Sequence, residues 1–383
     1  MRLTLTTLFF SDIPWTALYQ RPQHLAVRFA ARQTLLWVEP AVLGHPPRRR
    51  LVSIQEGISG LVLPYFPYNA RNFLLRAAAR ATGALAPAQA VLDRVQVSML
   101  AGAMRDLALP AGEAVAYLQN FQAFRAIRSC RVGRILYDCI DNPFGFARFP
   151  RPVHTLWRET LDAADALIAT SPTLADLLQR TSGRQAHVVS NGVEYARFAS
   201  PVERPRDLPD DGVPIAGYVG SVYPWIDFAL LEHLCRALPD VRVVVVGKEH
   251  PEVRPKLSAL SRYPNFLFLG HRPYQTVPSY LQHFNAGLIP FLRNQLTAGV
   301  NPVKLYEYAA AGLTPVATDF SPDLALFSPL ASICPTAEEF IAAVRSALSP
   351  DRRRTDALRA FARDNDWDAK AAQILALLNP ASR

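Results

Sequence analysis

The sequence predicts an α/β protein built from two doubly wound, parallel-sheet domains that face each other across a cleft. The 383 residues exceed one ordinary domain and fit two of roughly 180–200 residues each. Short β-branched runs alternate with longer stretches of helical period, which is typical of parallel sheets with helices on both faces. A stretch rich in proline and charge, residues 200–212, interrupts this alternation and is the expected linker.

Strands and helices alternate in order through the first half of the chain. The apolar opening Met1–Phe10 has one basic residue and no small-residue cleavage site, so we interpret it as a strand rather than a signal peptide. The expected strands are Leu3–Phe10, Thr34–Glu39, Leu61–Phe66, Val115–Gln119, Arg134–Ile140, Ala166–Thr170 and His187–Ser190. The expected helices are Pro22–Ala31, Asn72–Leu85, Ala88–Asp106, Val153–Ala164 and Pro172–Gln179. This order predicts a Rossmann-like sheet.

The second half repeats the pattern and predicts a second Rossmann-like sheet. Its expected strands are Ile215–Val219, Arg242–Val246, Phe266–Leu269, Ala286–Pro290, Thr314–Ala317 and Ala331–Ile333. The last stretch, Asp366–Leu378, is expected to form an amphipathic helix. Ligands of such sheets bind at the carboxyl ends of the strands, so functional residues are expected there.

Residues 301–318 carry the clearest functional pattern. Pro302 near a helix start and Gly312 past its end are ordinary helix boundaries. The helix N-terminus offers free N–H donors and partial positive charge, so it can hold a diphosphate, and Lys304 adds a full charge. Glu307 follows on the same face, where a carboxylate can accept hydrogen bonds from two ribose hydroxyls. A capped surface helix with a Lys–Glu pair is the alternative interpretation of this segment taken alone.

Together, several segments resemble the GT-B glycosyltransferases, and the resemblance covers nearly the whole chain. Residues 301–318 resemble the donor-site helix of that class, with Glu307 as the second Glu of its E-x7-E signature. The other matching segments are Ser190–Val193 with Phe198, Gly217–Ser221, Val244–Gly247, Phe268–His271, Tyr280 and Ala286–Phe291. The resemblance implies an N-terminal acceptor domain (1–200), a C-terminal nucleotide-sugar donor domain (201–365) and a last helix (366–383) that crosses back to the first domain.

The resemblance also implies roles for individual residues. The implied donor contacts are Gly220, Ser221, Lys248, His271, Asn301, Pro302, Val303, Lys304 and Glu307. The opening segments, Trp15 with Gln20–His24 and Tyr137–Asp141, resemble a bacterial subgroup of polysaccharide and cell-envelope assembly, with distant similarity to the glucuronosyltransferase of xanthan synthesis. The function implied is transfer of a sugar from a nucleotide sugar, a UDP-sugar being favoured, to a glycan or polyprenyl-diphosphate-linked acceptor.

An inverting transferase needs a general base close to the acceptor hydroxyl. Asp141 is the first candidate because it follows an expected strand at its carboxyl end, and Asp138 is the second. An Asp-Asn-Pro turn in which Asp141 bonds backbone amides is the alternative. His24 is the third candidate, although a buried and satisfied histidine is equally common. The expected acceptor contacts are Asp12, Trp15, Gln20 and Arg21.

Two departures from the family pattern change the expected chemistry. The first Glu of E-x7-E falls on Gly299, and Ser221–Asp227 stands where many retaining members carry a basic pair. Phosphate neutralisation is then left to the helix N-terminus and Lys304, helped by Lys248 or Arg293. Inversion and retention both remain open. Since no Asp-x-Asp with a metal role is present, we expect no metal and no other cofactor.

The charge is uneven along the chain and suggests a partner for the first half. Residues 1–200 hold 22 Arg and no Lys against 13 acidic residues, and the second half is balanced. The basic loop Arg48–Arg50 and the apolar helix with Arg71, Arg76 and Arg80 would suit an anionic membrane surface. A solvated face and a core-packed helix are the alternatives. We therefore expect a cytoplasmic protein, at most peripheral on the inner membrane face.

Other function classes fit less well. The four cysteines have no metal-binding spacing, and no stretch is long enough to span a membrane. No GxGxxG follows the first strand, which disfavours a nicotinamide dehydrogenase, and nothing resembles a nucleic-acid recognition motif. A non-hydrolysing nucleotide-sugar epimerase and a catalytically silent GT-B binding module remain as alternatives.

Overall fold

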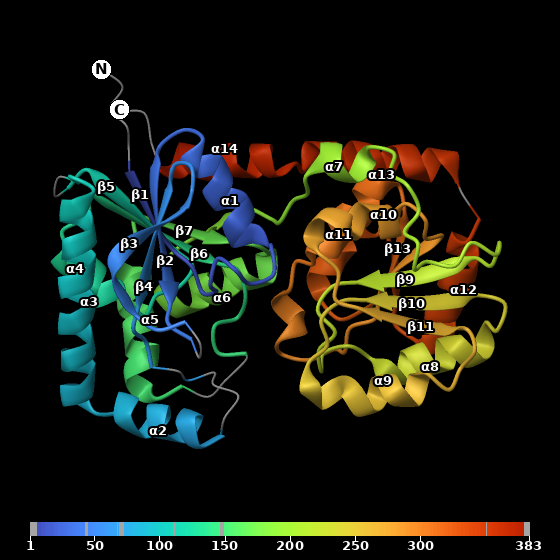
Figure 1. Cartoon of the computed structure of the whole chain (residues 1–383), viewed down its shortest axis with the longest axis horizontal. Coiled ribbons are helices and arrows are strands. Elements are labelled where there is room, and N and C mark those ends of the chain that lie inside the picture. Colours follow the sequence, from blue (N-terminus) through green and yellow to red (C-terminus); the bar gives the residue numbers. More distant parts are fainter. Residues whose placement is uncertain are drawn as a thin grey trace. The chain divides into compact units, whose positions relative to one another are not determined.

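The computed structural model describes residues 6–42, 45–66, 68, 73–109, 112–145, 149–349 and 351–378. The chain divides into two compact units (Figure 1). Unit 1 comprises Met1–Ser190 and Lys370–Arg383, and unit 2 comprises Asn191–Ala369. In the described residues, no helix is both long and apolar enough to cross a membrane.

Unit 1 is built on an eight-stranded sheet. The strand order is β3-β4-β2-β1-β5-β6-β7-β8, with β3 antiparallel to β4 and every other pairing parallel. The strands are β1 (Thr6–Phe10), β2 (Thr34–Pro40), β3 (Arg48–Gln55), β4 (Ile58–Leu63), β5 (Ala114–Leu118), β6 (Arg134–Cys139), β7 (Ala166–Ala169) and β8 (His187–Val188). Because the chain winds outward in both directions from β1 and β5, the switch point lies between these two strands.

Helices cover both faces of this sheet. The helices are α1 (Arg21–Ala30), α2 (Phe73–Gly83), α3 (Ala86–Asp106), α4 (Phe124–Ser129), α5 (Arg151–Ala163), α6 (Pro172–Ser182) and α14 (Trp367–Leu378). One core joins alternate strand residues such as Leu8 and Phe10 to α3, α4, α5 and α6. On the other face, Phe29 of α1 packs against Phe9 and Tyr117 at ring-centroid distances of 6.1 and 5.5 Å. This alternation follows from the two-residue period of a strand.

Unit 2 is built on a six-stranded, all-parallel sheet of order β11-β10-β9-β12-β13-β14. The strands are β9 (Ile215–Val219), β10 (Arg242–Val246), β11 (Phe266–Gly270), β12 (Ala286–Ile289), β13 (Thr314–Thr318) and β14 (Ser332–Cys334). The helices are α7 (Tyr195–Ala199), α8 (Phe228–Ala237), α9 (Arg254–Leu260), α10 (Val277–Leu281), α11 (Val303–Ala311), α12 (Ala337–Ala347) and α13 (Arg352–Asp364). Its switch point lies between β9 and β12.

The division between the units differs from the expected one. The stretch 200–212 is part of unit 2, where Leu208 is buried and Asp207 bonds Arg272 and Tyr280. The preceding residues Val193 and Phe198 are fully buried in the core of unit 2. The chain therefore passes between units at Ser190–Asn191 and again at Ala369–Lys370, and the proline-rich stretch is not the linker. The last helix does contribute its residues from Lys370 onward to unit 1, as the sequence predicts.

Strand β3 was not expected from the sequence. The basic residues Arg48–Arg50, predicted as a loop, form its first part and are exposed. Strand β3 is the edge of its sheet, where charged side chains disfavour pairing with another chain. Arg71 of the predicted basic helix lies outside the described residues, and α2 begins at Phe73.

Candidate active site

The donor side of the candidate site lies at the switch point of unit 2. Helix α11 follows β12 through a short turn of 3₁₀-helix at Thr297–Gly299, and its N-cap is Pro302. The carboxyl end of β9 leads into Gly220, whose φ is +142°. A Cβ on Gly220 would come within 2.6 Å of the Lys304 ammonium nitrogen, so a larger residue would make the flexible end of this side chain move away from the loop backbone. The structure thus brings together Gly220 and Lys304, which are far apart in sequence.

Two aromatic rings hold the Lys304 ammonium group in place. The Nζ atom lies 5.1 Å from the centroid of Tyr218 and 5.4 Å from that of Phe291, within the range of cation–π attraction. Burial lowers the pKa of Lys304, and the charge of Glu307 partly opposes that shift. A bound anion would favour the protonated form, so a phosphate at this site would raise the pKa of Lys304 again and keep its ammonium group charged.

Glu307 lies one turn further along α11 and is 7% exposed. Burial raises the pKa of Glu307, the charge of Glu194 adds to this effect, and Lys304 opposes it. No hydrogen bond to the Glu307 carboxyl is found among the described residues. Such a carboxyl can accept hydrogen bonds from ligand hydroxyls.

The other predicted donor residues lie around the same edge of the sheet. Ser221 follows Gly220 and is half-buried, and its carbonyl accepts from the Tyr218 hydroxyl at 2.7 Å. Lys248 and His271 follow β10 and β11, and both are exposed. Val303 opens α11 and is half-buried.

Asn301 has a structural partner in the loop that opens unit 2. Its side-chain oxygen accepts from the Asn191 backbone N–H at 2.9 Å, and its carbonyl accepts from the Asn191 side chain at 2.7 Å. Both asparagines are buried, as is Pro302. The Asn301 side-chain oxygen and carbonyl therefore form a fixed link between two loops of unit 2, and the donor contact of Asn301 stays a prediction.

Two carboxylates, Asp12 and Asp141, lie at the carboxyl edge of the unit 1 sheet. Asp12 follows β1 and Asp141 follows β6. Part of the Asp12 side chain is exposed, but surrounding protein displaces water from its carboxyl group. This desolvation and the charge of Asp141 raise the pKa of Asp12 to about 7. Loss of solvent raises the pKa of the half-buried Asp141 to about 7 as well. Two neighbouring acids poised near neutrality are suited to proton transfer.

The surroundings of these carboxylates differ from a simple turn. No hydrogen bond from a backbone amide to the Asp141 carboxyl is found in the described part of the chain. Tyr65, which follows β4, is half-buried with its hydroxyl enclosed, and both burial and the charge of Asp12 raise the pKa of Tyr65. Asp12 and Asp141 were assigned separate roles from the sequence, and the structure couples them electrostatically.

Asp138 and Arg21 form a buried ion pair. Asp138 lies within β6 and is 0% exposed, and Arg21 at the start of α1 is 3% exposed. The guanidinium donates to both carboxyl oxygens at 2.8 and 3.1 Å, and Asp138 also accepts from the Tyr117 hydroxyl and from Gln119. With its hydrogen-bonding capacity used inside the fold, this pair supports the sheet, and the base role of Asp138 and the acceptor contact of Arg21 stay predictions.

The remaining first-unit candidates surround the loop between β1 and α1. His24 is 0% exposed, and its ring packs edge-on against Tyr19 at 4.6 Å, so the structure gives this histidine an interior position rather than a solvent-facing one. Gln20 is exposed, and its backbone N–H donates to Gln23 at 3.1 Å. Trp15 is half-buried and packs at 90° against Trp37.

Glu39 organises this loop and was missed by sequence reasoning. Its carboxylate is 5% exposed and accepts from the Trp15 backbone N–H at 2.5 Å and from the Trp37 indole at 2.7 Å. His45 contacts its other oxygen at 2.5 Å. The only sequence signal was an acidic residue inside an otherwise apolar strand, which indicates a buried carboxylate with partners.

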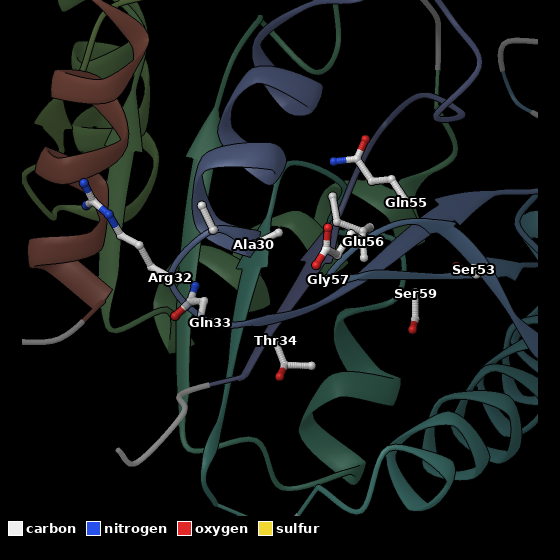
Figure 2. A pocket seen from close by; sticks show the side chains of 11 residues that line it. Ala30, Arg32, Gln33, Thr34, Ser53, Gln55, Glu56, Gly57 and Ser59 are labelled. Carbon is white, nitrogen blue, oxygen red and sulfur yellow. The ribbon is translucent and has the colours of Figure 1, made fainter. Parts of the chain in front are cut away.

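A hollow of about 460 Å³ lies at the opposite edge of the unit 1 sheet (Figure 2). It lies between the end of α1 at Ala30 and the β3–β4 hairpin with Gln55 and Gly57. Ligands of doubly wound sheets bind at the carboxyl ends of the strands, and this hollow is at the amino ends of β2 and β4. It is therefore separate from the candidate site. Within the described residues, no group of three or more His, Cys, Asp or Glu side chains could hold a metal ion.

Comparisons with known proteins agree with the arrangement of unit 2. Residues 229–376 match the family model described as glycosyl transferase-like. A protein of Bacillus subtilis (strain 168), which carries the name teichuronic acid biosynthesis glycosyltransferase TuaH, is 26% identical over 262 residues. That match covers 63% of this chain and 66% of the relative, so slightly less than two thirds of the relative's length is spanned.

Solved structures match nearly the whole chain. The apo structure of OtsA gives a TM-score of 0.72 at 15% identity and covers 99% of this chain and 100% of its own. A trehalose-6-phosphate structure from E. coli bound with UDP-2-fluoro glucose gives 0.71 at 15% identity, with 98% and 99% covered. Anabaena Alr3699/HepE in complex with UDP gives 0.66 at 16% identity, with 98% and 100% covered. The predicted resemblance is thus confirmed: the chain has the fold of the GT-B glycosyltransferases, and its second unit carries a glycosyl transferase-like domain.

Proposed function

We propose that this protein transfers a sugar from a UDP-sugar to a glycan or lipid-linked acceptor in polysaccharide or cell-envelope synthesis. The observation that carries the proposal is the Lys304 ammonium against Gly220 at the switch point of unit 2, with the buried Glu307 one turn along α11. A diphosphate at this helix N-terminus would meet N–H donors and Lys304, and Glu307 would accept from the ribose hydroxyls. Structural neighbours that hold UDP and UDP-2-fluoro glucose support the choice of uridine.

Asp141 is the proposed general base, with Asp12 as its partner. In an inverting transfer the acceptor oxygen bonds to the anomeric carbon, the bond from that carbon to the diphosphate breaks, and Asp141 takes the acceptor proton. A pKa of Asp141 near 7 favours this role at neutral pH. Lys304 would stabilise the leaving diphosphate without a metal ion. Proton NMR of the fresh product would distinguish inversion from retention.

Calorimetry with UDP-, GDP- and dTDP-sugars tests the donor assignment. Wild type is expected to bind one nucleotide class, and Glu307→Ala is expected to weaken that binding about tenfold to a hundredfold because ribose hydrogen bonds to a charged group are lost. Glu338→Ala is the matched control, since Glu338 is an exposed acid in the first turn of α12. Absence of binding by every nucleotide would overturn the proposal.

The relative named for teichuronic acid biosynthesis supports an envelope acceptor, and we propose that unit 1 meets anionic lipid there. Leu74 in α2 is 74% exposed, and Leu85 and Val91 beside α2 and in α3 are 58% and 59% exposed. Exposed arginines Arg48–Arg50 add positive charge on β3. Exposed apolar side chains and exposed basic side chains on the same unit suit a headgroup region.

Flotation with vesicles containing phosphatidylglycerol tests this contact. We expect the protein to float at low salt, and to remain at the bottom after Leu74→Asp or with neutral vesicles, because both changes weaken interfacial binding. The exposed Leu326, at 66% in unit 2, gives the control Leu326→Asp. Failure of wild type to float at low salt would remove the membrane proposal and leave the donor assignment intact.

A further inference from the structure

Three aromatic rings form a row on the loop that follows β9. The Tyr223 and Trp225 rings stack at a centroid distance of 4.7 Å and an interplanar angle of 11°. The His250 ring follows at 5.1 Å from Tyr223, tilted by 41°. All three residues are half-buried, and Pro224 between the first two is exposed. We call Tyr223, Trp225 and His250 the aromatic shelf.

The shelf has a fixed backbone because its loop is bonded on two sides. On one side, Val222 donates to the Lys248 carbonyl at 3.0 Å and accepts from the His250 N–H at 2.9 Å. On the other, the Trp225 carbonyl accepts from Leu292 at 2.7 Å, and Asp227 donates to the Pro290 carbonyl at 2.8 Å. Bonds to the segments after β10 and β12 hold the loop at the carboxyl edge of the sheet. A fixed loop loses little entropy when it binds a ligand.

The shelf is linked to the Lys304 site through one residue, Tyr218. The Trp225 side chain interacts with the Tyr218 hydroxyl, and that hydroxyl donates to the Ser221 carbonyl at 2.7 Å. The face of the same Tyr218 ring lies 5.1 Å from the Lys304 ammonium nitrogen. Trp225 therefore lies about one aromatic ring away from the cation that we assign to the diphosphate.

Trp225 packs against the core of unit 2 from its rim rather than inside it. Within the loop, Val222 and Ile226 are the buried anchors, at 0% and 1% exposure. The positions between them carry two large aromatic side chains that keep part of their surface in solvent. Tyr and Trp side chains placed this way offer an apolar face and a polar edge to a ligand, at small conformational cost.

We propose that the aromatic shelf is a sugar-binding subsite that packs against the pyranose ring next to the diphosphate. This rests on the proposed function. A pyranose presents a face of C–H groups to a ring and hydroxyls to its edge, which suits the Tyr223 hydroxyl and His250 Nε2. The other ring nitrogen, His250 Nδ1, accepts from the Glu252 backbone N–H at 3.4 Å. The ribose and base are assigned to the Glu307 side of α11, so the group next to Lys304 on the shelf side is a sugar, either the transferred one or that of the acceptor.

Calorimetry on Trp225→Ala and Tyr223→Ala tests the shelf, with UDP and with UDP-glucose, UDP-galactose, UDP-glucuronate and UDP-N-acetylglucosamine as probes. We expect the Kd of UDP to stay within about twofold of wild type, and the extra affinity that the best sugar adds to fall by about tenfold. Trp225→Phe keeps a ring but loses the indole N–H that contacts Tyr218. It is expected to retain most of that extra affinity. This variant therefore distinguishes stacking of the ring on the sugar from an indirect effect of the indole on Tyr218 and Lys304. Tyr263→Ala, which removes a half-buried aromatic residue just before β11, is the matched control.

Saturation-transfer NMR with methyl α-D-glucopyranoside in the presence of UDP covers an acceptor sugar. If the donor sugar adds no affinity in wild type, a saturation-transfer signal of this pyranoside that disappears in Trp225→Ala supports the shelf as an acceptor subsite. The proposal would be overturned if the affinity for the donor sugar and the saturation-transfer signal of the pyranoside were both unchanged in the two alanine variants. It would also be overturned if Trp225→Ala bound UDP itself tenfold more weakly while Trp225→Phe bound it normally, because that result assigns the shelf to the nucleoside. Failure of wild type to bind any nucleotide is a different result, because it removes the proposed function first.

Discussion

Asp141 is expected to control the pH dependence of transfer. A base acts in its deprotonated form, so kcat/KM should rise with pH through about 7, the pKa that burial gives Asp141. Asp141→Asn should lower kcat by about a hundredfold to ten-thousandfold. Asp12→Asn should leave the rising limb at about the same pH, because burial and not the charge of Asp12 raises the pKa of Asp141. A flat profile between pH 5 and 8 in wild type would argue against Asp141 as the base.

Asp138→Asn tests whether the buried ion pair is structural. The Arg21 guanidinium would keep its charge in an interior without a compensating carboxylate, so the free energy of unfolding should fall by about 3–5 kcal/mol. Urea titration measures this change, and the exposed Asp356→Asn serves as control. A variant of unchanged stability that has lost transfer activity would instead return Asp138 to the catalytic group.

The sequence could identify chemical candidates at this scale, but not their partners. Asp12 and Asp141 both follow strands in the pattern of residues 1–200, and each was assigned a role. That their charges interact depends on how three neighbouring strands are ordered, which one sequence does not state. Asp138 and Arg21 are 117 residues apart in sequence, and their pairing appears only when the fold brings the start of α1 to β6.

At the scale of elements, the loop between β9 and α8 and the start of α11 work as one unit. Gly220→Ala is expected to weaken UDP binding about tenfold or more, since the new Cβ would lie 2.4 Å from Lys304 Cε and displace the ammonium group. Gly212→Ala is the control: it also has a positive φ, +79°, but nothing lies within 4 Å of the added carbon. Equal nucleotide affinity in both variants, measured by calorimetry, would contradict the role of this approach.

Element prediction succeeded where burial is complete and failed at an edge. Strand β9 matches its predicted bounds, Ile215–Val219, because five consecutive buried residues give an unbroken apolar run. Strand β3 was missed because Arg48–Arg50 open it and the strand has little apolar character. It is a strand because it pairs with β4, and this pairing cannot be predicted from its local composition.

At the scale of the whole molecule, the sequence predicted two domains but placed their boundary wrongly. Proline and charge in residues 200–212 are typical of linkers, yet Leu208 is buried and Arg272 bonds Asp207, so the stretch is fixed to unit 2. The chain crosses at Ser190–Asn191 instead, where no change in composition marks the passage. The composition of a segment indicates its average solvent exposure. It does not indicate which domain core a single buried residue such as Leu208 packs into.

The division into two units, with α14 returning to unit 1, predicts two separable unfolding transitions in scanning calorimetry. UDP should raise only the transition of unit 2, by about 2.7 kcal/mol of stability at a hundredfold excess over Kd. Ile374 in α14 is fully buried and belongs to unit 1. Ile374→Ala should therefore lower the free energy of unfolding of unit 1 by about 2–5 kcal/mol and leave the response of unit 2 to UDP unchanged. Leu326→Ala, at a position 66% exposed, should move neither. If UDP and Ile374→Ala instead shift the same transition, the two units unfold as one cooperative body, and the prediction of two separable transitions is wrong.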